Sequence, residues 1–143
     1  MKEEKVSLKT AKIIKEKGFD IGVNHFYTEY LKTRKSDNPS FRMTKGEVEL
    51  ESGYFINNHT LSDLSNINYI NYAAPTQSMV QKWLREKYNI DVSSLPKRRQ
   101  TDNKKIYIYS LHENGGESKI SEGYLTHEEA FEIGLQEALK LVN

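Results

Sequence analysis

The stretch KKIYIYSLHENGGESKISEGYLTHEEAFEIGLQEALKLV, residues 104–142, carries two strand patterns followed by a helix pattern. Its first part, residues 104–113, is rich in isoleucine and tyrosine, which favour strands. Asn114-Gly115-Gly116 has the composition of a tight turn, so a return strand is expected at 118–125. The opening part of this stretch therefore predicts a β-hairpin.

The same stretch ends in the clearest helix pattern of the chain. Thr126 and Glu129 have the spacing of a capping box, and Glu128 suits the positive end of the helix dipole. Beyond them, apolar residues recur at helical spacing as far as residue 142. A helix with so wide an apolar face must pack against another element, and strands are expected to supply it.

Two further helices are expected upstream of the hairpin. One covers 7–17, where Ser7 is a good N-cap and Gly18 is a typical stop signal. The other covers 75–88, and its apolar stripe contains Trp83, the only tryptophan of the chain. Trp83 is interpreted as a core anchor, with stacking on a ligand as the alternative.

The remaining chain divides into strands and loops. Strands are expected at 21–30 and 47–56, whereas 33–45, 57–72 and 93–103 have the composition of loops. The predicted fold class is therefore α+β. A small, mainly antiparallel sheet, built from 21–30, 47–56, 104–113 and 118–125, is packed by three helices at about 7–17, 75–88 and 126–142.

Composition restricts the class of protein. The chain has 143 residues, a formal net charge of +1 and no cysteine. Residues 1–143 are expected to form a single domain. Disulfides, cysteine-ligated zinc, iron–sulfur centres and a thiol nucleophile are excluded. No apolar run is long enough for a membrane span, and a cytoplasmic location is expected.

The neutral total conceals a basic segment. Residues 81–105 carry eight basic and three acidic side chains, while residues 106–143 carry two basic and seven acidic ones. The densest basic group is followed by two tyrosines at alternating positions, a combination that single-strand binders use to track phosphates and stack bases. Nucleic-acid binding is therefore one alternative function, through Lys97, Arg98, Arg99, Lys104, Lys105, Tyr107 and Tyr109. On this hypothesis the tyrosines face solvent, and Ile106 and Ile108 face the core. The opposite interpretation is a solvated linker beside a sheet face that the last helix covers.

Candidate chemistry is sparse. No two of the four histidines have the i, i+4 spacing of a helical metal site, so neither a metal nor a cofactor is expected. A small hydrolase or nuclease, with His112 or His127 beside a carboxylate, is a further alternative, although no nucleophile, base and orienting group occur together. Glu47, Glu49 and Glu51 would line one face of a strand, as a solvated face, a protected sheet edge or a cation site.

Three blocks of the chain carry a resemblance to a known group. They are 7–20, the segments 74–77, 81–86 and 90–92, and the segments 123–130 and 134–139. APTQ, QKWLRE, GYLTHEEA and GLQEAL are their most distinctive stretches. In these blocks the chain resembles small uncharacterised proteins carried by phages and prophages of Bacteroides-type bacteria. The resemblance implies a phage setting and a place in the host cytoplasm, and it implies no activity, cofactor or site residue.

These observations favour a binding module over an enzyme. The expected protein acts through its surface on a host or phage protein and has no chemistry of its own. The best candidate surface in the sequence is the Asn-rich segment with Tyr69 and Tyr72, because tyrosine and asparagine make adaptable contacts. The alternative interpretation is that these tyrosines complete the core. The partner and the oligomeric state are left open.

Overall fold

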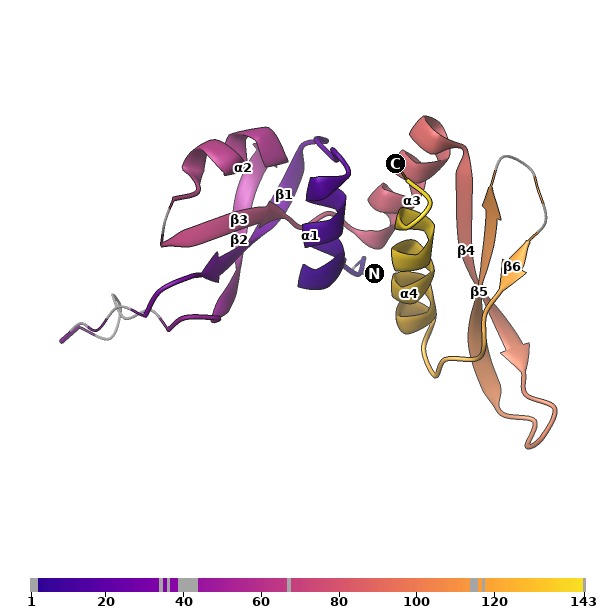
Figure 1. The fold of residues 1–143 in the computed structure, drawn as a ribbon. Coiled ribbons are helices and arrows are strands. Elements are labelled where there is room, and N and C mark those ends of the chain that lie inside the picture. The colour runs from indigo at the N-terminus through magenta and orange to yellow at the C-terminus, as the bar shows by residue number, and fades with distance from the viewer. Residues whose placement is uncertain are drawn as a thin grey trace.

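The computed structural model describes residues 3–33, 35, 37–38, 44–66, 68–113, 116 and 118–142. In these residues the chain has an α+β fold, with two separate three-stranded antiparallel sheets. Helices α1, α3 and α4 lie between the two sheets (Figure 1). The α+β class predicted from the sequence is confirmed.

The N-terminal half forms the first sheet. It contains β1 (Val23–Tyr30), β2 (Val48–Ile56) and β3 (Tyr69–Ala73), in the order β2-β1-β3. Helix α1 (Leu8–Glu16) covers one face, and the short helix α2 (Asn58–Leu64) packs beside β3. The central strand is therefore β1, and β2 is an edge strand.

The C-terminal half forms the second sheet, in the order β4-β5-β6. Helix α3 (Gln77–Tyr88) leads directly into β4 (Ile90–Arg98), which pairs with β5 (Lys105–Glu113) over nine residue pairs. Strand β6 (Lys119–Ile120) is short, and helix α4 (His127–Leu139) packs across β4 and β5.

Local signals position the helices as the sequence predicts. The hydroxyls of Ser7, Thr76 and Thr126 accept hydrogen bonds from backbone N–H groups in the first turns of α1, α3 and α4. Gly18 has a φ of 88° beyond α1, and Asn89 is left-handed at the end of α3. The three predicted helices are therefore present, and none of their ends is shifted by more than three residues.

Three details of the predicted sheet are wrong. The strands belong to two sheets instead of one, because α1, α3 and α4 occupy the space between them. Part of the predicted loop 57–72 forms α2 and most of β3, and part of the predicted linker 93–103 belongs to β4. The return strand of the hairpin shrinks to β6 and one bridge between Tyr107 and Tyr124. The predicted turn residues Asn114 and Gly115 lie outside the described residues.

The core is continuous from one half of the chain to the other. Buried side chains of α1 and β1 join those of α3, β4 and α4 in one cluster. Trp83 is buried at this junction, where its ring meets Phe19 edge-on at 5.3 Å and Tyr88 at 5.2 Å. Trp83 is therefore the core anchor that its place in the helical stripe predicts.

One carboxylate ties the helices together. Glu132 on α4 accepts hydrogen bonds from the Ser7 backbone N–H at 2.7 Å and the Thr10 hydroxyl at 2.6 Å. Its second oxygen accepts from the Gln77 side-chain amide at 3.0 Å. Because Thr10 is on α1 and Gln77 on α3, Glu132 fixes three helices relative to one another.

Candidate functional site

Apart from the two-residue strand β6, β2 is the most exposed of the described strands. Seven of its nine residues are exposed and none is buried. In the register with β1, Tyr27 pairs with Leu50, while Thr28 pairs with Glu49. Leu50 therefore points to the α1 face of the sheet, where its side chain is half exposed, and Glu49 points to the opposite face.

An irregularity in β2 displays two aromatic rings. Between the pairs Val23–Ile56 and His25–Ser52, β1 contributes one residue and β2 contributes three, so the ladder bulges outward. Tyr54 and Phe55 are in this bulge, with 86% and 73% of their surface exposed. Their rings contact each other edge-on at 5.5 Å.

The backbone of this bulge is strained. Phe55 has a φ of 49°, a left-handed conformation that costs a non-glycine residue about 1–2 kcal/mol. Its N–H donates to the side-chain oxygen of Asn24 at 3.5 Å. A Cβ on Gly22 would lie only 2.8 Å from the Phe55 ring, so a side chain at residue 22 would displace that ring. The neighbouring chain thus holds Phe55 in an exposed, strained position.

Carboxylates line the other face of β2. The Tyr30 hydroxyl donates to Glu49 at 3.0 Å. Burial and this hydrogen bond, together with nearby carboxylates, raise the pKa of Tyr30 to about 12. A hydrogen bond to Glu49 raises the pKa of Glu51 above its ordinary value. This face of β2 therefore concentrates negative charge, as the alternation of Glu47, Glu49 and Glu51 predicts.

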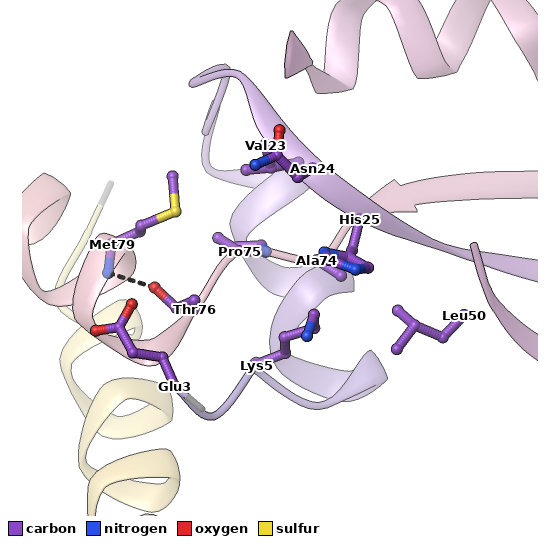
Figure 2. A pocket seen from close by; sticks show the side chains of 10 residues that line it. All are labelled: Glu3, Lys5, Val23, Asn24, His25, Leu50, Ala74, Pro75, Thr76 and Met79. Atoms are coloured by element: carbon purple, nitrogen blue, oxygen red, sulfur yellow. Dashed lines mark hydrogen bonds between the residues drawn. The ribbon is translucent and has the colours of Figure 1, made fainter. Parts of the chain in front are cut away.

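A pocket of about 420 Å³ adjoins β2 on the α1 face. Figure 2 shows Leu50 at one side of this space, with His25 and Lys5 also facing it. The remaining lining is mixed: Val23, Ala74, Pro75 and Met79 are apolar, and Glu3, Asn24 and Thr76 are polar.

The predicted surface tyrosines are partly covered. Tyr69 and Tyr72 belong to β3 and point to opposite faces of the sheet. The Tyr69 ring packs edge-on against Tyr30, and the ammonium groups of Lys12 and Lys15 lie 5.7 and 4.9 Å from the centre of the Tyr72 ring. The structure therefore does not present these two rings together as an open surface.

The basic residues gather at the end of the β4–β5 hairpin. Arg98 pairs directly with Lys105, Lys97 is the preceding residue of β4, and Lys104 directly precedes β5. Arg99 is engaged by a bidentate ion pair with Asp102, and this pairing lowers the pKa of Asp102 to about 2. The structure thus brings all five predicted basic residues to one end of the second sheet.

The orientation expected for the adjacent tyrosines is wrong. The Tyr107 ring contacts His127 at 6.0 Å, and a Cβ on Gly134 of α4 would lie 2.8 Å from Cβ of Tyr109. Both tyrosines therefore face α4, whereas Ile106 and Ile108 lie on the opposite face of the sheet, where both are nevertheless buried. Both faces of this strand are apolar, so alternation could not show which one the helix covers.

The histidines are dispersed. His112 contacts the Ser118 hydroxyl through Nε2 at 2.7 Å, and its cross-strand partner is Asp91, whose carboxylate is bonded to Arg85 at 3.1 Å. Both nitrogens of His112 face Ser118, and no hydrogen bond or ion pair between described residues joins a carboxylate to the ring. Within the described residues, no cluster of three or more potential metal ligands occurs.

None of the described helices combines the length and hydropathy needed to cross a bilayer. No protein-family model matches the chain, and comparisons with curated proteins and with solved structures found no significant match. The candidate site therefore rests on its own geometry. The sequence signal that could have identified it is the pair Tyr54-Phe55, two large aromatic residues directly after Gly53 at the end of an acidic strand.

Proposed function

We propose that this protein is a binding module that acts on another protein through the exposed surface of β2, without chemistry of its own. The observation that carries the proposal is the exposure of Tyr54 and Phe55 on a strained bulge. Leaving large aromatic side chains in water forfeits about 1.5–3 kcal/mol each. Aromatic residues are also enriched at the centres of protein interfaces, where they contribute much of the binding energy.

The proposed setting is the cytoplasm of a phage-infected host cell. It is supported by the resemblance of the N-terminal, central and C-terminal blocks to phage and prophage proteins of Bacteroides-type bacteria. The proposed partner is accordingly a host or phage protein that covers Tyr54 and Phe55 in the complex.

Affinity capture from infected host cells tests this function. We expect the chain to retain a specific partner, and we expect Tyr54→Ser combined with Phe55→Ser to reduce the recovered amount at least tenfold. Leu125→Ser is the matched control, because Leu125 is as exposed as Phe55 but follows β6. Equal recovery with both variants, or no specific partner, would contradict the proposal.

Nucleic-acid binding is a second candidate, favoured by one observation. Arg98 and Lys105 are directly opposite each other in the β4–β5 ladder, and like charges in that position destabilise a sheet unless an anion compensates them. Lys97 and Lys104 extend the same positive end of the hairpin. A salt-dependent gel shift that is lost in Lys97→Ala, Arg98→Ala, Arg99→Ala would support this function. No shift at low salt would eliminate it.

A further inference from the structure

The two edges of the first sheet differ in whether other parts of the chain cover their outward-facing backbone groups. Along β3, side chains of α2 and its C-terminal end cover the outer backbone: the Ala73 N–H donates to Asn58 at 2.9 Å, and the Asn71 N–H donates to Ser65 at 3.0 Å. Strand β2 has no such cover from any part of the chain that the structure describes. Because successive residues of a strand direct their backbone groups to opposite edges, half of the β2 groups face away from β1.

We infer that the free edge of β2 accepts an extended segment of a partner protein as an additional strand, and that this segment alternates apolar and basic side chains. The inference rests on the proposed binding function and identifies its partner chemistry. Strand addition obtains affinity from main-chain hydrogen bonds and specificity from the side chains on each face. One face of β2 is apolar and the other is acidic. The added strand must therefore alternate apolar and basic side chains to match both faces.

The α1 face selects apolar side chains. Val48 and Leu50 both point to this face and are substantially exposed. An apolar side chain opposite Leu50 would lie beside the pocket that Leu50, Pro75 and Met79 help to line (Figure 2). Covering these exposed groups removes apolar surface from water, which favours association.

The opposite face selects basic side chains. Glu49 and Glu51 point there, two positions apart along the strand, and they interact with each other. A lysine or arginine on the neighbouring strand would stand directly opposite one of these carboxylates, at a distance where opposite charges stabilise a sheet. The mutual repulsion of the two glutamates would then be relieved.

The same charges disfavour a second copy of this chain as the occupant. An antiparallel pairing of the regular part of β2, residues 48–52, with the same residues of a second copy places Glu49 of one copy directly opposite Glu51 of the other. Like charges facing each other across a ladder are destabilising. Charge complementarity therefore favours a basic segment of another protein.

The test uses the full chain and an eight-residue peptide that alternates valine and lysine. We expect this peptide to bind more than tenfold more tightly than a peptide of the same composition with its lysines in one block. Two further peptides carry N-methyl groups on alternate backbone amides. In one peptide the methylated amides lie along one edge of the added strand, and in the other they lie along the opposite edge. One of them should lose binding, because its methyl groups face β2, and the other should retain it.

Charge reversal on the chain completes the test. Glu49→Lys with Glu51→Lys should weaken binding of the valine–lysine peptide at least tenfold and should create binding to a valine–glutamate peptide. Glu113→Lys with Glu122→Lys is the control, because both residues are exposed but belong to the other half of the molecule. The control should leave both affinities unchanged.

Retention of binding by both N-methylated peptides, or no binding of the valine–lysine peptide, would overturn the inference. Equal affinities for the alternating and blocked peptides would also overturn it. If these results coincided with partner capture that depends on Tyr54 and Phe55, the binding function would stand and only strand addition would be wrong. Dimerisation of the chain through β2 would instead identify a second copy as the occupant and would also overturn the inference.

Discussion

At the scale of single residues, Glu49 and Glu51 lower the stability of the free chain because they repel each other, while the same two charges would favour binding of a basic segment. Both are on an exposed strand, and the hydrogen bond between them requires a shared proton. This arrangement raises the pKa of Glu51 above the ordinary value of 4.5. An acid whose pKa is raised on folding adds stability below its unfolded pKa and loses that contribution as the pH rises through its folded pKa.

Glu51→Gln should therefore stabilise the chain at neutral pH. The amide keeps a donor for Glu49 at every pH and removes the repulsion between two carboxylates, with a gain of about 0.5 kcal/mol at this exposed position. The gain should diminish at about pH 3, where Glu51, whose pKa is raised above 4.5, is itself protonated. Thermal unfolding at both pH values measures the difference, with Glu122→Gln as the control for charge removal. A variant that is less stable than the parent at pH 7 would contradict the explanation.

At the scale of elements, the packing of α4 on β4 and β5 depends on one small residue. Gly134 faces the sheet, where an added Cβ would lie 2.8 Å from Cβ of Tyr109 and 3.0 Å from Cγ1 of Val92. Neither contact atom is the far end of a flexible side chain. The absence of a side chain at Gly134 therefore sets how closely the helix approaches the strands.

Gly134→Ala should destabilise the protein in spite of the better helix propensity of alanine. The propensity gain is about 1 kcal/mol, whereas forcing a methyl group into a packed interface costs about 1–3 kcal/mol. We expect a net loss of about 1 kcal/mol in the free energy of unfolding, measured by urea denaturation. An increase in stability would show that α4 can move away from Tyr109 at little cost.

At the scale of the whole molecule, two sheets share one set of helices. Glu132 accepts hydrogen bonds from the N-terminal end of α1 and from Gln77 on α3, and the buried cluster passes through the same region. Trp83 contacts Phe19, which follows α1, so its fluorescence reports on the junction between the halves. We therefore expect both halves to unfold together.

Glu132→Ala tests this coupling. Losing a charged acceptor leaves the Ser7 N–H, the Thr10 hydroxyl and the Gln77 amide short of partners, at a cost of about 2–4 kcal/mol. Trp83 fluorescence and far-UV circular dichroism should still follow a single transition in urea, shifted to lower concentration. Glu137→Ala, which removes an exposed ion pair with Lys140 on the same helix, should cost less than about 1 kcal/mol. Two separated transitions in the parent protein would contradict a shared core.

The sequence by itself determined the fold class and the helices α1, α3 and α4, because caps, stop signals and apolar stripes act over a few residues. Ser7, Thr126 and Asn89 perform the roles that their chemistry predicts. Only the tertiary structure decided that Asn71 belongs to a strand. Its side chain is buried, and its oxygen is satisfied there by a hydrogen bond of 2.7 Å that the Thr28 hydroxyl donates from the neighbouring strand. This contact joins residues that are far apart in the chain.

The candidate site likewise has features that the sequence predicts and features that only the tertiary structure decides. The acidic face of β2 could be predicted from the sequence, because glutamates occur at every second residue. The bulge that exposes Tyr54 and Phe55 is not, because it arises from the register between β1 and β2. Local patterns specify which residues can form an element, whereas burial, edges and register depend on which elements meet, and that is a property of the assembled chain alone.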